Sequence, residues 1–508
     1  MSGDREGESH TPIVEGREKS DRVVVPKKPP NEAETSAEEA VEGRTLTKGN
    51  TSEADMCRTQ GRVGMPSGLE RVREVAKRDR KARFTSLFHH ITVELLDRAF
   101  GSLNRRAAAG VDGVTWAEYA EGRAQRLADL HARLQRGAYH AKPSRRTSIP
   151  KMDGQPRLLG IAALEDKIVQ RAVVWVLEAI YETDFCEFSY GFRPGRKPHD
   201  ALDALAWGIH WKKVNWVLDA DIRGFFDTID HGWLVKFVEH RIGDRRIVRL
   251  IQKWLSAGVM DGETWAAVDE GTPQGATVSP LLANIYLHYV FDLWAQRWGR
   301  RQASGDMVVA RYADDIVVGF QHEHEAQRFM QELHARMGEF ALQLHPEKTR
   351  LLMFGRFAAE RRHERKLARP ETFDFLGFTH ICGRSLGGKF LLLRHTVRKR
   401  LRAKLKSIRV TLKKGRHRPI AAQGKWLGAV VRGYLNYHAV PTNNAVIHIF
   451  CDQVLHAWLA ALRRRSQTGK LTWTRFKRIA SRWIPRPKIL HPYPQERYAS
   501  TRGRSPVR

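Results

Sequence analysis

The sequence has few cysteines and no long apolar segment. Cys57, Cys186, Cys382 and Cys451 are the only cysteines in 508 residues, and none lies near another cysteine or a histidine at zinc-site spacing. We therefore expect neither a disulfide framework nor a structural zinc site, and we expect a reducing, cytoplasmic compartment. No run of 18 or more apolar residues occurs, and the N-terminus lacks a signal-peptide pattern. A membrane partner is therefore not expected.

Acidic residues are also in short supply. The chain has 56 of them against 87 lysines and arginines, which gives a formal net charge of +31 and a pI of about 10.3. So many positive charges repel one another unless a polyanion compensates them, so nucleic acid is the expected partner. Residues 1–55 hold 13 acidic and 8 basic residues, whereas residues 394–508 hold 28 basic and 2 acidic residues. We expect the C-terminal part to provide most phosphate contacts.

Apolar patterning separates a leader from a folded part. Residues 1–65 lack apolar periodicity and are rich in Glu, Ser, Thr, Gly and Pro, which predicts a disordered leader. Helical spacing then begins near Leu69 and includes the segment Phe84–Leu103. The middle of the chain alternates as strand, helix, hairpin, helix and strand, with an amphipathic helix expected after the loop TPQG. This order predicts an α+β fold in which helices pack on an antiparallel sheet. Residues 396–483 are expected to form basic helices.

Three aspartates interrupt the strands of this α+β region. Asp314 and Asp315 separate the two apolar runs of RYADDIVVGF, which predicts a β-hairpin with the pair at its tip. Asp221 ends the strand in VLDADI. One turn aspartate is ordinary, but three carboxylates at strand ends in a strongly basic chain indicate bound cations. Oxygen ligands without Cys or His favour Mg²⁺, and two such ions roughly 3.5–4 Å apart support phosphoryl transfer.

Several sequence blocks, taken in order, resemble one protein family. DADIRGFF, TPQGATVSPLLANIYL and YADD resemble the palm of reverse transcriptases. GVDGVTW, SIPKMDGQPRLLGI, SYGFRPGRKPHDAL, LHPEKTRLLMF and FDFLGF resemble successive blocks of group II intron-encoded reverse transcriptases. The resemblance covers about residues 80–490. It implies a right-hand polymerase fold, in which fingers and a palm with an antiparallel sheet precede a helical thumb or maturase (X) domain.

The resemblance also implies roles for single residues. Asp221, Asp314 and Asp315 match the catalytic, metal-binding carboxylates. Phe226 matches the aromatic side chain that excludes a 2′-hydroxyl, with Phe225 as the alternative and core packing as the other explanation for either. Lys151 and Arg157, which flank the MDGQP turn, match a basic pair that holds the incoming nucleotide, although charges of a solvated turn would also explain them. Gln274 and Gly275 match the loop beside nucleotide and template, and Lys348 matches a phosphate contact.

The basic C-terminal part has a counterpart in the same family. RKRLRAKLKSIRVTLKK and GYLNYH resemble the thumb, and aromatic residues interleaved with arginines suit RNA through stacking and phosphate contact. About half of these aromatics are expected in the helix core; they are Trp426, Tyr434, Tyr437, Trp458, Trp473 and Trp483. The expected RNA contacts are Arg398, Arg400, Arg402, Lys404 and Lys406. Many relatives end in an HNH endonuclease with paired cysteines, and the lack of cysteine after Cys451 predicts that this domain is missing.

The same comparison predicts how the chain is divided. The expected parts are an acidic leader at 1–65, an N-terminal extension with the fingers at 66–215, the palm at 216–394, the thumb at 395–485 and a basic tail at 486–508. The leader has no counterpart in the family.

Together these features predict an RNA-directed DNA polymerase that depends on Mg²⁺ and is encoded by a group II intron, whose RNA it also binds to assist splicing and mobility. The expected partners are intron RNA, an RNA template with a DNA primer, deoxynucleoside triphosphates and a DNA target. One alternative is a related bacterial reverse transcriptase in phage defence or CRISPR adaptation, against which the thumb-like GYLNYH block argues. Another is an RNA-binding splicing cofactor without polymerase activity, which is expected to lose one or more of the three carboxylates retained here.

Overall fold

The structure is a computed structural model that describes residues 67–150, 156–262, 264–267, 270–272, 275–465 and 471–497. The predicted acidic leader and residues 498–508 of the predicted tail lie outside these ranges. The helices before the C-terminal part are α3 Ser67–Arg78, α4 Val93–Ser102, α5 Trp116–Ala120, α6 Arg123–Gln135, α7 Leu164–Asp184, α8 Pro198–Trp211, α9 His231–Arg241, α10 Arg245–Leu255, α11 Ser279–Leu287, α12 Leu293–Arg301, α13 Glu323–Glu339 and α14 Ala358–Glu364, with 3-10 turns η1 Phe88–His90 and η2 Phe225–Asp227 and a π-helical segment η3 His288–Asp292.

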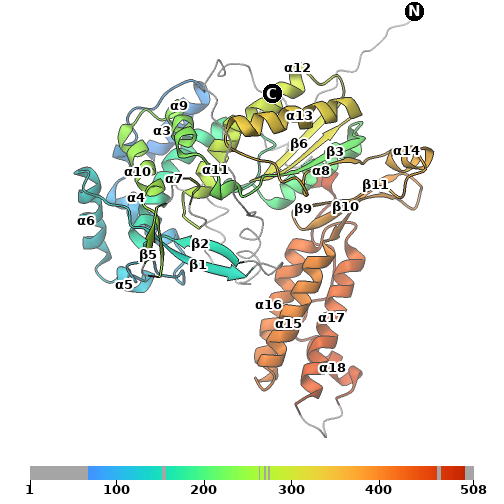
Figure 1. Cartoon of the computed structure of the whole chain (residues 1–508). Helices are drawn as coiled ribbons and strands as arrows, with labels where there is room; N and C mark the ends of the chain where they lie inside the picture. Colours follow the sequence, from blue (N-terminus) through green and yellow to red (C-terminus); the bar gives the residue numbers. More distant parts are fainter. Residues whose placement is uncertain are drawn as a thin grey trace, which may run out of the picture.

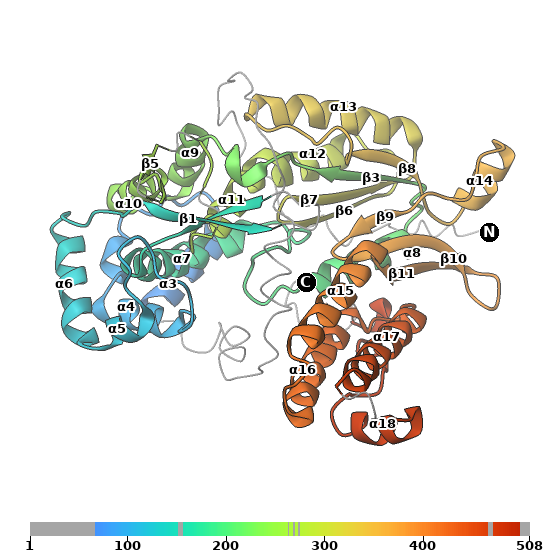
Figure 2. The ribbon, with the colours of Figure 1, turned by 60° about the horizontal axis from the view of Figure 1, so that its bottom comes forward.

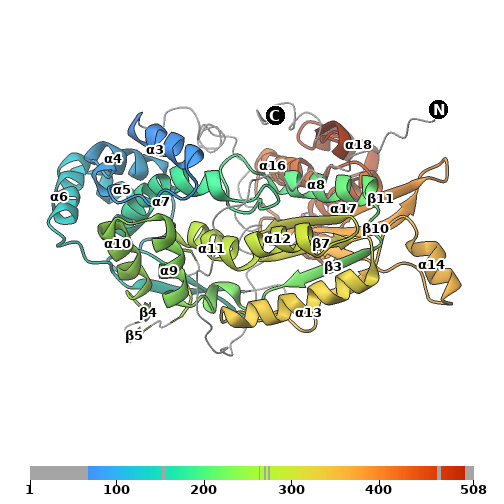
Figure 3. The same cartoon turned by 90° about the horizontal axis from the view of Figure 1, so that it is seen from above.

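A four-stranded antiparallel sheet lies at the centre of the molecule (Figure 1). Its strands follow the order β6-β7-β3-β8, with bounds β3 Trp216–Asp221, β6 Met307–Tyr312, β7 Asp315–Phe320 and β8 Arg350–Met353. Strands β6 and β7 form the hairpin predicted from RYADDIVVGF. Side chains on both faces are buried, because α13 packs on β3 and β7 while α8 packs on β6 (Figure 3). The predicted α+β architecture with an antiparallel sheet is confirmed.

A second sheet lies in the N-terminal part, among helices α3 to α7 and beside α9 and α10 (Figure 2). Its order is β2-β1-β4-β5, with bounds β1 Ser144–Pro150, β2 Pro156–Ile161, β4 Val259–Asp261 and β5 Thr264–Ala266. Strands β1 and β2 are antiparallel and flank the MDGQP segment, as predicted. The predicted turn itself, residues 152–155, lies outside the described residues. The long helix α7 connects this part to the centre through apolar side chains buried along its whole length.

The C-terminal part is a helical bundle with its own core. A three-stranded sheet in the order β11-β10-β9 precedes it, with bounds β9 Phe373–Phe375, β10 Phe378–Arg384 and β11 Phe390–Thr396. The helices are α15 Arg398–Lys414, α16 Ile420–His438, α17 Asn444–Arg463 and α18 Trp473–Ala480. Leu405, Phe450 and Trp458 belong to a buried cluster separate from the core around the central sheet. The helices expected within 396–483 are present, but they are not uniformly basic: α15 and α18 are rich in lysine and arginine, whereas α17 is largely apolar. The division of the chain into domains stays a prediction.

Two helix expectations were wrong. The segment Phe84–Leu103 does not form one helix, because Thr92 accepts a hydrogen bond from the backbone N–H of Leu95 and caps α4 there. The helix after TPQG is not amphipathic. In α11 every residue except Pro280 is buried, since the helix passes between the central sheet and the N-terminal part. A helix that is apolar all round is typical of such a central position.

One helix of the described residues, α17, is long and apolar enough to cross a membrane by length and composition. Its apolar side packs into the bundle core through Ile447, Phe450, Val454 and Trp458. This packing accounts for its apolar character. The sequence analysis did not identify the helix as apolar, because it contains no uninterrupted apolar run of 18 residues.

The segment after α18 returns to the base of the bundle. The backbone N–H groups of Leu490 and His491 donate to the carbonyl oxygen of Ala439, just beyond α16. Arg497 Nε lies 3.1 Å from Asp203 Oδ2 on α8, and Arg394 Nη1 on β11 donates to Asp203 Oδ1 at 2.8 Å. Asp203 and Arg394 are buried, so this ion triad joins the bundle base to the helix that covers the central sheet.

Candidate active site

Three aspartates meet at one end of the central sheet. Asp221 is the last residue of β3, and it pairs in register with Asp315, the first residue of β7. Asp314 lies in the turn that joins β6 to β7. Asp221 and Asp314 are 5% and 4% exposed, and Asp315 is half-buried. The structure thus brings together the three carboxylates that the sequence analysis selected at separate places in the chain.

The turn that carries Asp314 is tight. Tyr312 pairs with Asp315, so Ala313 and Asp314 alone connect the two strands. Ala313 has a φ of 57°, in the left-handed region that two-residue hairpin turns require and that glycine usually occupies. An alanine stays in this conformation only where its surroundings hold it there. Tyr312 is buried, and burial raises the pKa of its hydroxyl to about 12.

Lys348 lies against one of the carboxylates. Its Nζ donates to Asp221 Oδ2 at 2.9 Å, and the backbone N–H of His345 donates to the Asp221 carbonyl at 2.8 Å. The segment HPEKT therefore packs beside the end of β3. The sequence analysis matched Lys348 to a phosphate contact, whereas in the structure its ammonium group neutralises part of the Asp221 carboxylate.

The carboxylates have the chemistry of a divalent-cation site. Asp221 Oδ1 is buried and accepts no hydrogen bond from any described residue, and a buried carboxylate oxygen is costly unless a cation or donor compensates it. Within the described ranges, no group of three His, Cys, Asp or Glu side chains lies in closed metal-ligand geometry. By ligand type these carboxylates fit a hard cation. Their oxygens do not form a complete set of metal ligands within the described residues.

A series of aromatic rings leads from Tyr312 in the hairpin to η2. Phe226, in η2, is 7% exposed, whereas Phe225 is fully buried with its ring 6.5 Å from that of Tyr286 on α11. The ring of Phe192 lies 6.4 Å from the rings of both Phe226 and Tyr312. Phe192 also has a φ of 59°, which is rare for a bulky residue. Of the two candidates for the sugar-facing aromatic, the one with exposed surface is Phe226.

The two described residues of TPQG, Thr272 and Gly275, lie beside η2 and β2, respectively. The backbone N–H of Thr272 donates to the Phe226 carbonyl at 2.7 Å. Gly275 has a φ of 114°, and a Cβ there would lie 2.8 Å from the Gly160 carbonyl oxygen, so only glycine fits. Arg157 is in β2 opposite Ile149, and its side chain lies outside the described residues. Lys151 and Gln274 also lie outside them, so the nucleotide-binding roles stay predictions.

The five predicted RNA contacts do not share one face of α15. Arg398, Arg402 and Lys406 are exposed and spaced four residues apart, which places them along one side of the helix. Arg400 and Lys404 are half-buried on another side, and burial lowers the pKa of Lys404. Alternate residues diverge by about 200° around a helix, so the five could not lie together. The exposed row is extended instead by Arg409 and Lys413.

About half of the six aromatics of the C-terminal part were expected in a core, but all six pack against one, and none is exposed. Tyr434 and Trp458 are fully buried in the bundle core. Trp426, Trp473 and Trp483 are partly buried against it, and Tyr437 packs against the core around the central sheet. Their part in RNA binding stays a prediction.

Comparison with known proteins gives one family. Residues 149–380 match the model for reverse transcriptase (RNA-dependent DNA polymerase). Protein YkfC of Escherichia coli (strain K12) is 37% identical over 275 residues, which cover 48% of this chain and 71% of that protein. Group II intron-encoded protein LtrA of Lactococcus lactis subsp. cremoris is 34% identical over 223 residues, 43% of this chain and 37% of that protein. Nuclear intron maturase 2 of Arabidopsis thaliana is 29% identical over 104 residues, 20% of this chain and 14% of that protein.

The matched span contains the three aspartates, the hairpin and the TPQG loop. The match covers most of YkfC but only about a third of LtrA and less of the other intron proteins. The resemblance inferred from the sequence blocks is confirmed. The chain belongs to the reverse transcriptase family, the RNA-dependent DNA polymerases, and its relatives include group II intron-encoded proteins and an intron maturase.

Proposed function

We propose that this chain is an RNA-directed DNA polymerase with a right-hand fold, encoded by a group II intron. The central sheet with Asp221, Asp314 and Asp315 is the palm, and the β1–β2 hairpin with its surrounding helices forms the fingers. Helices α15 to α18 form the thumb, or maturase domain. The observation that carries the proposal is the register of β3 with β7, which sets Asp221 opposite Asp315 and beside the turn of Asp314.

The three aspartates would hold two Mg²⁺ ions. When bound, these ions would activate the 3′-hydroxyl of a primer and stabilise the leaving oxygen of the nucleotide. The chain itself positions the reactants. Phe226 and Phe192 form an aromatic wall beside the carboxylates, and the glycine at 275 allows the TPQG loop to approach β2 closely. Lys348 balances the charge of Asp221.

We further propose that the thumb binds intron RNA and assists its splicing and mobility. The exposed row of cations on α15 supports this, as does the similarity to a group II intron-encoded protein and an intron maturase. The expected partners are intron RNA, template RNA with a DNA primer, deoxynucleoside triphosphates and target DNA, in the cytoplasm.

Primer extension tests the polymerase activity directly. The purified chain, given an RNA template annealed to a DNA primer, deoxynucleotides and Mg²⁺, is expected to synthesise complementary DNA, and chelation of the metal should stop synthesis. The same preparation is assayed for splicing of the intron RNA that surrounds the gene. Splicing without extension would favour a cofactor that no longer polymerises. Extension without any flanking intron RNA would favour the defence or CRISPR-adaptation alternative.

Phe226→Ala is expected to relax discrimination against ribonucleotides, because it removes the side chain that would meet the 2′-hydroxyl. The ratio of ribonucleotide to deoxynucleotide kcat/KM should rise by about 10-fold or more. Phe225→Ala serves as the control, since Phe225 is fully buried: it should lower stability without changing the ratio. A changed ratio with Phe225→Ala alone would transfer the role to that residue.

A further inference from the structure

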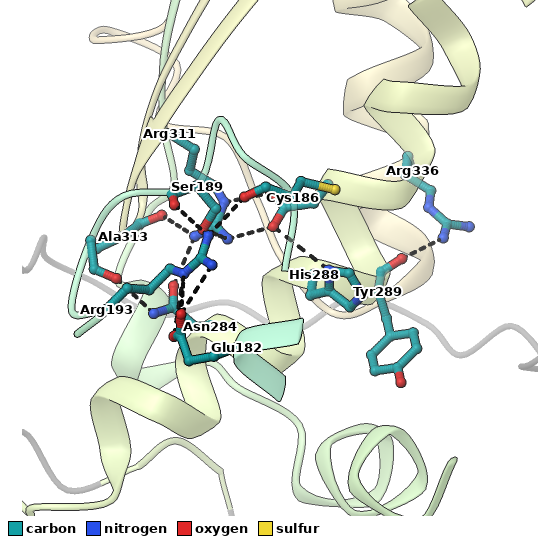
Figure 4. A network of polar contacts seen from close by, with 12 residues as sticks. Glu182, Cys186, Ser189, Arg193, Asn284, His288, Tyr289, Arg311, Ala313 and Arg336 are labelled. Carbon is teal, nitrogen blue, oxygen red and sulfur yellow. Dashed lines mark hydrogen bonds and ion pairs between the residues drawn. The ribbon is translucent and has the colours of Figure 1, made fainter. Parts of the chain in front are cut away.

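Arg311 is fully buried and directly precedes the Tyr-Ala-Asp-Asp segment. All three nitrogens of its guanidinium group donate hydrogen bonds. Nε and Nη2 donate to the two carboxylate oxygens of Asp292, each at 2.6 Å. Nη1 donates to Asn284 Oδ1 at 3.1 Å, and Nη2 donates to Ser189 Oγ at 2.6 Å. Nη1 also donates to the carbonyl oxygen of Ala313 at 3.0 Å, inside the turn that carries Asp314 (Figure 4). Arg311 thus ties the turn to two other parts of the fold.

The two acceptors on the long helix are brought together by its π-helical segment. Residues eight apart on an α-helix, such as Asn284 and Asp292, lie about 80° apart around the axis. The segment η3, which ends at Asp292, has wider turns and rotates Asp292 back toward the side of Asn284. Arg336 of α13 donates to the carbonyl oxygens of Tyr289 (Figure 4) and of Val290, and so holds this segment in place. The π segment therefore has a structural consequence at the turn.

The loop that contains Ser189 presses on the same turn from another side. Its residues run beside β6, with the Tyr190 N–H donating to the Arg311 carbonyl at 2.9 Å. A Cβ on Gly191 would lie 2.3 Å from the backbone nitrogen of Ala313, so the two backbones are in direct contact. Asn284 Nδ2 donates to the Gly191 carbonyl at 2.7 Å. The side chain of Asn284 thus joins the helix, the loop and Arg311.

We propose that Arg311 is a positioning residue for DNA synthesis, which holds the left-handed turn at Ala313, and with it the Asp314 carboxylate, through the buried contacts to Asp292, Asn284 and the 189–191 loop. The proposal rests on the proposed polymerase function, and it adds residues that do not themselves reach the reacting atoms. The strained turn needs such support, because an alanine does not adopt this backbone conformation unaided.

Arg311→Lys is the first test, on the full chain. A lysine keeps the charge but cannot contact Asp292, Asn284 and Ala313 at once, because it lacks the planar fork of donors. We expect kcat for primer extension to fall by about 100-fold, since small displacements of catalytic groups cost that much. KM for the deoxynucleotide should change by less than about threefold, which indicates an effect on the transition state. The Mg²⁺ concentration for half-maximal rate should rise, and amide hydrogen exchange at residues 313–315 should accelerate without substrate.

A double variant separates positioning from stability. Replacing a buried ion pair by apolar residues of similar volume is often neutral for stability, so Arg311→Met with Asp292→Leu should restore the melting temperature that Arg311→Met alone lowers. The contact to the Ala313 carbonyl is not restored, so extension should stay about 100-fold reduced. Recovery of both stability and extension in the double variant would overturn the proposal and leave Arg311 a purely structural role.

Gly191→Ala displaces the turn without altering Arg311. Its Cβ meets backbone atoms of Ala313 and Tyr312, so kcat should fall by at least about 10-fold. Gly101→Ala on α4, where a Cβ meets nothing within 4 Å, is the matched control and should leave extension unchanged. If the wild-type chain extends primers while Gly191→Ala and the double variant match it in kcat, the positioning role is wrong. If the wild-type chain does not extend primers at all, the polymerase proposal itself fails, and accelerated exchange at residues 313–315 in Arg311→Lys still reports on the turn.

Discussion

Asp314→Asn should abolish DNA synthesis and leave RNA binding intact. The amide replaces a buried carboxylate at the tip of the β6–β7 hairpin and removes one negative charge from the expected Mg²⁺ ligands. Primer extension should fall by about 10³-fold or more, because the metal ions lose a ligand while the shape of the turn is kept. The affinity for structured RNA should change by less than about twofold, since the basic surface of the bundle is untouched.

Asp219→Asn is the matched control for this prediction. Asp219 lies on the same strand as Asp221, two residues earlier, and its carboxylate pairs with Arg350 at 3.5 Å. Its neutralisation should leave extension close to that of the wild-type chain. Extension by Asp314→Asn at a near-normal rate would remove the hairpin from the active site, and equal losses in both variants would show a general effect of charge on the sheet.

Reversing the charge of Arg398, Arg402 and Lys406 together should weaken RNA binding strongly. These three side chains are exposed along one face of α15, so glutamates there would replace attraction to phosphates by repulsion. The slope of log affinity against log salt should become shallower by roughly two units, because each phosphate contact contributes somewhat less than one unit. Splicing should decline more than extension of a short primer that is already annealed, and the processivity of extension should fall somewhat.

A control variant with the same change in net charge separates the effect of the position of the charges on α15 from the effect of the total charge. Arg297, Arg300 and Arg301 lie on α12, on the opposite side of the central sheet from the bundle (Figure 1). Three glutamates at these positions should reduce affinity only through the overall charge and keep the slope nearly unchanged. Equal slopes for both triple variants would place the RNA surface away from α15.

Local patterns in the sequence predicted the hairpin and the positions of the three aspartates at strand ends, because strand alternation and turn chemistry depend on neighbouring residues. The role of Arg311 was not predicted, since its partners Asn284 and Asp292 lie 27 and 19 residues before it and Ser189 lies 122 residues before it. A signal was present: an arginine within the apolar run MVVARYA is buried only with a carboxylate partner. The sequence gives no hint of which carboxylate that is.

The position of Lys348 and the faces of α15 show the same limit. The contact of Lys348 with Asp221 joins residues 127 apart, so only the fold reveals it. Which of the five predicted RNA-contacting side chains on α15 are exposed depends on which side of the helix packs on α17. Leu405, Ile408 and Leu412 mark that side. Helical spacing in the sequence would have separated Arg400 and Lys404 from the other three.

The return of the chain to the base of the bundle determines where an attached protein would be held. Because Arg497 is anchored to Asp203 on α8, a partner fused directly after it would begin beside the central sheet and not at the far end of α18. A short linker would keep that partner close to the junction between the bundle and the central sheet. A purification tag attached after Arg497 therefore needs a long spacer to stay clear of this junction.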